Sequence, residues 1–304
     1  HVGQHPHVYI ENHRIVGLAK DDPLSIILDP RTVDRSSYQE RFQFAPQHRF
    51  RGGAAARYKA EDVTVKLTEK AVQWINAQKD RRTPFFLYLA HRNVHAPLKP
   101  HERFRGTSEI GVYGDFIHEL DWSVGKILAA LKEGGFADDT LVFFSSDNGA
   151  VQAGHQPAKF ASYDGHRANG NLRGQKTEVY EGGHRVPLLV RWPRRVKRAS
   201  ASHELVALTD VMATVADVLE REVPETAGED SFSFLHVLAG RPSKVRQRET
   251  LVHDSNQGYF AIRHGPWKLI TIQGGGGIGW KEERSDTDLP FGQLYQLEKD
   301  PGET

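Results

Sequence analysis

The sequence lacks several features that would have narrowed its function at once. It has no cysteine, which excludes disulfides, thiolate metal ligands and a cysteine nucleophile within these 304 residues. Its 40 Lys and Arg residues nearly balance 39 Asp and Glu residues, so charge gives no argument for a nucleic-acid partner. No apolar run approaches the roughly 18 residues that a membrane-spanning helix needs. We therefore expect neither nucleic acid nor a membrane as a partner.

Methionine is also scarce, because Met212 is the only one and the chain begins at His1. The first ten residues, HVGQHPHVYI, lack the basic start and the apolar stretch of a signal peptide. The chain ends in 298-EKDPGET-304. We expect from these features that the sequence is a piece of a longer protein, although it is long enough to bury a large core.

What is present is an alternation of helix and strand patterns. Apolar residues recur with a period near 3.6, which predicts helices, over 60–79, 112–132 and 204–220. Short continuous apolar runs, which predict strands covered on both faces, occupy 85–90, 141–146 and 186–192. Helices that alternate with strands imply parallel strands joined by right-handed crossovers. The expected fold class is α/β, with a mostly parallel sheet flanked by helices.

The pattern changes near residue 241. Four short segments separated by turns predict a small antiparallel sheet, namely 249–254, 258–264, 266–272 and 293–300. The glycine-rich stretch 274-GGGGIGW-280 lies among them and is expected to form a loop. We therefore expect two domains, 1–240 and 241–304.

Polar residues follow two of the predicted strands. Asp147 and Asn148 come after 141–146, and His95 lies in the loop after 85–90. Ligands of open α/β sheets bind beyond the carboxyl ends of the strands, and carboxylate and amide oxygens are the ligands that Ca²⁺ and Mg²⁺ prefer. Two oxygen ligands are too few, since Ca²⁺ usually takes about 6 to 8. Asn148 and Gly149 could equally form a tight turn, so the residues alone leave both interpretations open.

Two further side chains carry suitable chemistry. His95 can donate a proton near neutral pH, because the free pKa of histidine is about 6.5. Lys176 has a compact ammonium that suits an anionic oxygen, and the glycines around it would let the backbone approach a ligand closely. Each feature alone is also typical of exposed side chains and ordinary turns. Their order and spacing together are more specific.

Three segments in this order resemble the sulfatases of the alkaline phosphatase superfamily. They are 85-FFLYLAHRNVHAP-97, 141-LVFFSSDNG-149 and 172-LRGQKTEVYEGGHRVPLLVRWP-193. The segments 266-PWKLI-270 and 294-LYQLEKDPGET-304 also resemble the family's C-terminal region. Within the family, the chain is most similar to bacterial arylsulfatases and to N-acetylgalactosamine-6-sulfatase-like members. The resemblance implies an alkaline-phosphatase-like fold, with a catalytic domain over 1–240 and a small subdomain over 241–304.

The resemblance also implies a reaction, the hydrolysis of sulfate monoesters of carbohydrates or aryl alcohols. It makes Asp147 and Asn148 ligands of a calcium ion. His95 becomes a partner of the sulfate or of the leaving oxygen, and Lys176 bridges the sulfate and the ester oxygen. Candidates for the substrate side are His184, Arg185, His91 and His166.

One part of the family pattern is missing. The nucleophile of such enzymes is a hydrated formylglycine made from Cys or Ser in a C/S-x-P-x-R motif, and no such motif occurs here. The aspartate pair that completes the metal site is missing as well. We expect both in an N-terminal segment of an intact parent, which would be periplasmic or secreted, and we expect this chain alone to be inactive. The alternatives are phosphate or phosphonate ester hydrolysis within the superfamily and a non-catalytic glycan-binding relative.

Overall fold

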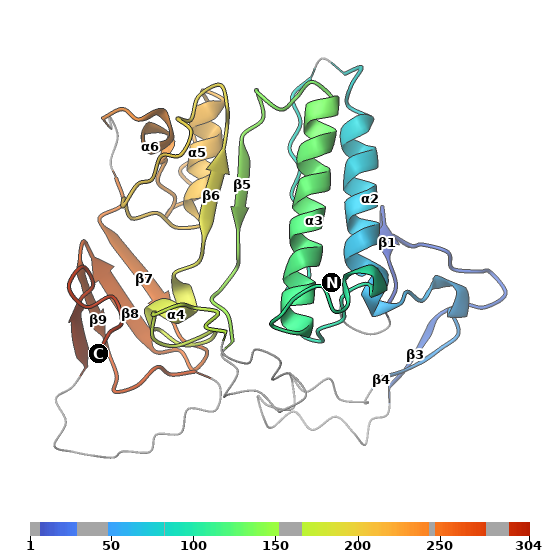
Figure 1. Ribbon diagram of the computed structural model, residues 1–304, viewed down its shortest axis with the longest axis horizontal. Coiled ribbons are helices and arrows are strands. Elements are labelled where there is room, and N and C mark those ends of the chain that lie inside the picture. The colour runs from blue at the N-terminus through green and yellow to red at the C-terminus, as the bar shows by residue number, and fades with distance from the viewer. Residues whose placement is uncertain (1–6, 29–47, 82, 152–165, 243–246, 278–291) are drawn as a thin grey trace. The chain divides into compact units, whose positions relative to one another are not determined.

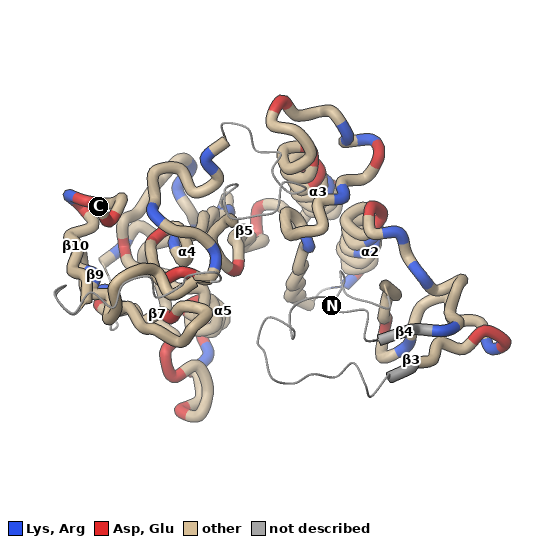
Figure 2. The backbone as a smooth tube through the Cα atoms, turned by 90° about the horizontal axis from the view of Figure 1, so that it is seen from below, with Lys and Arg blue, Asp and Glu red and all other residues tan. Residues whose placement is uncertain are grey.

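The computed structural model of the chain describes residues 7–28, 48–81, 83–151, 166–242, 247–277 and 292–304. The chain divides into two compact units, His1–Gly134 and Gly135–Thr304 (Figure 1). Basic and acidic positions are interspersed along both units (Figure 2).

The first unit is built around two helices that lie side by side (Figure 1). Its strands pair as two short antiparallel ladders, β1 with β2 and β3 with β4. The elements in chain order are β1 (Ile10–Glu11), β2 (Arg14–Ile15), β3 (Ser25–Leu28), β4 (His48–Arg51), η2 (Ala54–Ala56), η3 (Ala60–Asp62), α2 (Val63–Asn76), η4 (Glu102–Phe104) and α3 (Val112–Glu133).

Helices α2 and α3 match the predicted helices closely. The first begins with the 3-10 turn η3 and continues as α2, and the second ends where Gly135 takes a left-handed φ of 77°. Val63 and Ile75 of α2 and Phe116 of α3 are at most 1% exposed, so the apolar stripes form the core of this unit. The helices therefore form where the 3.6-residue period placed them.

The structure corrects the prediction of a strand over 85–90. Its side chains alternate between half-buried and exposed, as in an extended chain, and Phe85 packs edge-on against Trp74 with ring centroids 5.4 Å apart. Within the described residues, however, no ladder pairs with this segment. The apolar run dictates an extended backbone, but a strand also requires a hydrogen-bonded neighbour, which a local pattern cannot supply.

The second unit contains a two-stranded ladder, three short helices and a four-stranded sheet. Its elements are β5 (Val142–Ser145), α4 (Glu181–His184), β6 (Leu188–Arg191), α5 (Asp210–Val218), α6 (Leu235–Ala239), β7 (Thr250–Asp254), β8 (Phe260–His264), β9 (Trp267–Ile270) and β10 (Gln293–Gln296).

The direction of the strands is a second correction to the sequence prediction. Strands β5 and β6 are antiparallel, with Val142 opposite Arg191 and Ser145 opposite Leu188. All ladders among the described residues are in fact antiparallel. A parallel pair needs a long crossover, whereas the described part of the connection between β5 and β6 contains only the four-residue helix α4. The chain therefore turns back at the end where β5 finishes.

The predicted C-terminal antiparallel sheet is confirmed. Its strand order is β10-β9-β8-β7, and every neighbouring pair is antiparallel. The buried face contributes Ala261 and Ile270, which are 0% exposed and pack against Val179 and Tyr180 from the segment just before α4. The small sheet is therefore packed directly onto the lysine- and glycine-rich segment.

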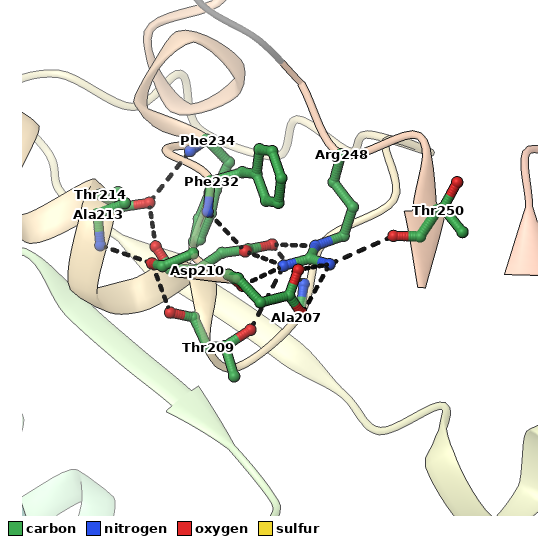
Figure 3. Close-up of polar contacts among 11 residues, drawn as sticks. Ala207, Thr209, Asp210, Ala213, Thr214, Phe232, Phe234, Arg248 and Thr250 are labelled. Atoms are coloured by element: carbon green, nitrogen blue, oxygen red, sulfur yellow. Dashed lines mark hydrogen bonds and ion pairs between the residues drawn. The ribbon is translucent and has the colours of Figure 1, made fainter. Parts of the chain in front are cut away.

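Helix α5 is shorter than predicted, because it starts at Asp210 rather than near residue 204. The Asp210 carboxylate accepts hydrogen bonds from the backbone N–H groups of Ala207 and Phe232, and it is paired with Arg248 at 2.7 Å (Figure 3). A side chain that bonds to backbone groups outside the helix competes with helical hydrogen bonds. This buried pair fixes the start of α5.

Candidate functional site

The Asp147–Asn148 segment follows directly after β5. The Ser145 hydroxyl donates to the Pro187 carbonyl at 2.8 Å, which ties the end of β5 to the start of β6. The Ser146 hydroxyl donates to the Asn148 carbonyl at 3.0 Å, and the Asn148 amide nitrogen donates to the Gly149 carbonyl at 3.0 Å. The Asp147 side chain is exposed, and its carboxylate and the Asn148 amide oxygen are both hard oxygen donors.

This segment packs against the glycines of α4. The Gly149 N–H donates to the Gly183 carbonyl at 2.8 Å, and a Cβ atom on Gly149 would lie 1.8 Å from the Gly182 carbonyl oxygen. A Cβ on Gly182 would lie 2.4 Å from the backbone oxygens of Arg173 and Gly174. Only glycine permits such close approach of main chains. Gly149 and Gly182 therefore allow the predicted motif segments to lie in direct main-chain contact.

The lysine segment joins the same cluster. The Lys176 N–H donates to the Ala150 carbonyl at 3.2 Å. The Asn169 side chain links the two segments, since its oxygen accepts from the Ala150 N–H and its nitrogen donates to the carbonyls of Ala150 and Gly174 at 2.9–3.1 Å. Thr177, next to Lys176, has a φ of 81°, which is strained for a β-branched residue and typical of functional sites. The segments that carry Asp147, Asn148 and Lys176 are thus joined by hydrogen bonds at Gly149 and Ala150.

His184 lies in a half-buried histidine pair. Its ring packs on that of His253 with centroids 4.2 Å apart, and His253 Nε2 donates to the Val179 carbonyl at 3.1 Å. Burial, reinforced by His184, lowers the pKa of His253 to about 3, and burial also lowers the pKa of His184. Both rings are therefore neutral at neutral pH.

The other substrate-side candidates differ in exposure. Arg185 is exposed, and its guanidinium lies 3.7 Å from the Glu181 carboxylate. His166 is half-buried and follows the undescribed residues 152–165. Their predicted contacts with substrate, like that of His184, stay predictions.

His95 belongs to the first unit and lies in a loop that is held by hydrogen bonds from Arg92 and Asn93. Asn93 donates to the Phe116 carbonyl and to the Glu119 carboxylate at 3.0 and 3.2 Å, and the buried Arg92 donates to the Ala60 carbonyl at 2.7 Å. These contacts hold the loop on α2 and α3 and leave the His95 side chain exposed. The predicted role of His95 toward the sulfate or the leaving oxygen stays a prediction.

His91, in the same loop, faces inward. Its Nε2 contacts the Ser123 hydroxyl of α3 at 3.2 Å, and burial lowers its pKa. This contact anchors the loop, and the predicted role of His91 toward substrate stays a prediction.

The sequence reasoning missed residues that support the cluster from outside the motifs. Asn169 is one, and its only sequence signal is its place beside glycine in 168-ANGN-171. The others are Glu181, Lys268 and Glu303, which form a buried ionic group. No local pattern marks an ion pair between residues so far apart in sequence.

Comparison with known proteins identifies the family. The sulfatase family model matches residues 29–220, which include every candidate site residue. An N-acetylgalactosamine-6-O-sulfatase of Bacteroides thetaiotaomicron is 34% identical over 98% of this chain. The chain belongs to the sulfatase family. Human steryl-sulfatase is 37% identical over 70% of the chain.

The expected alkaline-phosphatase-like α/β fold is confirmed by solved sulfatase structures, although the described ladders of this chain are antiparallel. A Bacteroides thetaiotaomicron protein, described with the metabolism of multiple glycosaminoglycans, superposes with a TM-score of 0.80 at 32% identity. It matches 98% of this chain, which covers 65% of that protein. The chain spans 61% of the N-acetylgalactosamine-6-O-sulfatase and 35% of human steryl-sulfatase. The sulfatase relationship therefore extends over nearly all of this chain but only part of its relatives.

Within the described ranges, no group of three or more His, Cys, Asp or Glu side chains could hold a metal ion. No helix in that part of the chain is long and apolar enough to cross a membrane.

Proposed function

We propose that the full-length protein carrying this chain hydrolyses sulfate monoesters of sulfated carbohydrates. The observation that carries the proposal is the main-chain junction of the Asp147–Asn148 segment with the Lys176 segment, in a chain of the sulfatase family. Because the relative that matches 98% of the chain is named for 6-O-sulfated N-acetylgalactosamine, we take that sugar as the substrate class.

A calcium ion fits part of this site. Asp147 and Asn148 would hold it through a carboxylate and an amide oxygen, the donor chemistry that Ca²⁺ prefers. Two donors are fewer than the ion requires, so further ligands would come from elsewhere in the full-length protein, as would the formylglycine nucleophile, whose motif is absent from these 304 residues. The ion would supply positive charge to the bound sulfate.

The roles of the side chains follow from their chemistry. Lys176 would place its ammonium against the oxygen that links sulfur to the leaving group, where negative charge develops as the ester bond breaks. His95 would donate a proton to that leaving oxygen, in keeping with its exposed position on an anchored loop.

The test uses the full-length protein with an aryl sulfate and with 6-O-sulfated N-acetylgalactosamine. Lys176→Ala should lower kcat by about 10²–10³-fold, because it removes a group that acts on developing charge. Asp147→Ala should instead raise the calcium concentration needed for activity. The exposed Lys197→Ala is the matched control and should change neither quantity.

An aryl phosphate assayed in parallel tests the main alternative. Faster turnover of phosphate than of sulfate, or full sulfatase activity in Lys176→Ala, would overturn the proposal. No turnover of any ester, together with binding of the sulfated sugar, would favour a glycan-binding relative.

A further inference from the structure

A buried ionic group connects the C-terminal sheet to the site. Lys268 of β9 is 0% exposed, and its ammonium lies 3.1 Å from the Glu181 carboxylate and 2.8 Å from the Glu303 carboxylate. Glu181 is 3% exposed and Glu303 is 0% exposed. A lysine is almost never fully buried unless it is paired, and here both partners are buried with it.

Glu303 makes more than this ion pair. Its other carboxylate oxygen accepts from the Glu181 N–H at 2.6 Å, and its carbonyl accepts from the Arg173 guanidinium at 2.5 Å. Arg173 also stacks on Tyr180, with its guanidinium carbon 4.1 Å from the ring centroid. Glu303 has a φ of 53°, a left-handed conformation that costs energy and persists only when surrounding contacts enforce it. The strained turn is thus held against the motif segment from several sides.

Burial works against the charged form of Glu303. It raises the pKa of Glu303, and Lys268 opposes that rise. The guanidinium of Arg263 lies 3.6 Å from the Glu181 carboxylate. Arg263 of β8 and Lys268 of β9 therefore compensate the negative charge of the two buried carboxylates.

The ionic group is connected to helix α4 through Glu181, which is the first residue of that helix. The next residue, Gly182, donates its N–H to the Arg173 carbonyl at 2.6 Å, and Gly183 accepts from the Gly149 N–H. A displacement of Glu181 would therefore move the contacts that join the Asp147–Asn148 segment to the lysine segment.

We propose that Glu303 and Lys268 are positioning residues, which hold α4 so that Asp147, Asn148 and Lys176 keep their mutual arrangement. The catalytic consequence rests on the proposed sulfatase function, whereas the positioning itself does not. Neither side chain touches the site directly, and both act through Glu181.

The first test is hydrogen exchange in the full-length protein, read by mass spectrometry. Glu303→Gln keeps the shape and an acceptor for the Glu181 N–H but removes the charge. We expect exchange in 147–150 and 173–184 to accelerate by about tenfold or more, because local opening becomes easier. Glu298→Gln, an exposed acid on the same strand-turn segment, is the control and should leave exchange unchanged.

If Glu303→Gln does not fold, Tyr295→Phe removes the hydroxyl that accepts from Arg173 at 3.1 Å and loosens the same turn more gently. Unchanged exchange in the folded variant would overturn the proposal.

The second test asks whether Glu303 acts through Lys176. Glu303→Gln should lower kcat on an aryl sulfate about tenfold in the parent but less than about twofold in a Lys176→Ala background, since coupled residues are not additive. Equal losses of kcat in both backgrounds would mean that Glu303 has only a structural role, and would refute its proposed effect on catalysis. If the parent hydrolyses no sulfate ester, the proposed function fails, and the exchange experiment still decides whether Glu303 positions α4.

Discussion

Arg248 offers a stability prediction whose size can be worked out from its two partners. Its guanidinium pairs with Asp210 at 2.7 Å (Figure 3) and with Asp230 at 3.2 Å. The Arg248 and Asp210 side chains are 2% and 1% exposed, whereas that of Asp230 is 73% exposed. Breaking a buried pair costs about 3–5 kcal/mol because the remaining charge stays unpaired, but an exposed pair contributes at most about 1 kcal/mol. The Asp210 pair should therefore dominate.

The variant Arg248→Leu should lower the free energy of unfolding by about 3 kcal/mol, at the low end of that range. Asp210 would keep its hydrogen bonds from the backbone of Ala207 and Phe232, which limits the loss. Asp230→Asn should cost less than about 1 kcal/mol. Urea unfolding of the full-length protein, followed by circular dichroism, measures both changes.

A double variant decides whether the unpaired charge is the cause. Asp210→Asn added to Arg248→Leu removes the stranded carboxylate, so the double variant should be more stable than Arg248→Leu alone. A double variant that loses the sum of the two single effects would refute the reasoning, as would equal losses from Asp230→Asn and Arg248→Leu.

Two further predictions concern the glycine contacts and the half-buried His253. Gly182→Ala should reduce sulfatase activity more than tenfold, since its Cβ would lie 2.4 Å from two backbone oxygens, and initial rates measure this loss. Gly125→Ala, on the exposed face of α3, should instead raise the free energy of unfolding by about 0.5–1 kcal/mol, which melting curves measure. The lowered pKa of His253, about 3, means that the unfolded chain binds more protons than the folded chain below about pH 6.5, so stability should fall as pH falls through that value. His253→Gln should lose stability less steeply between pH 7 and 5 than the parent, and parallel slopes would contradict the assignment.

The elements that the sequence predicted best are those whose signals are local. The helix over 112–132 was confirmed as α3 almost to the residue, because its apolar stripe and the glycines after it act within one segment. The C-terminal strands were confirmed because turn residues separate short β-type runs. The segment 85–90 has the extended alternation of a strand, but pairing depends on a neighbour that no local pattern specifies.

Long-range polar contacts account for most of what the sequence did not predict. The sequence pattern places Asp210 inside the predicted helix 204–220, and its bonds to Ala207 and Arg248 appear only when the chain is folded. Lys268 and Glu303 likewise carry no pattern that distinguishes them from exposed residues. The sulfatase family could be identified from the segments around Asn148 and Lys176, because their residue types and spacing are confined to short stretches of sequence.

The candidate site is held by two kinds of contact, which should respond differently to substitution. The links from Gly149 to Gly183 and from Lys176 to Ala150 are main-chain hydrogen bonds, so replacing the Lys176 side chain changes the chemistry and leaves these links in place. The links from α4 to the C-terminal sheet are side-chain ion pairs that are buried with their partners. Substitution there removes stability and arrangement together, because an unpaired buried charge must be relieved by movement of the backbone that carries it. Loss of activity at constant stability therefore marks a residue that contacts the substrate, and loss of both marks one that holds α4.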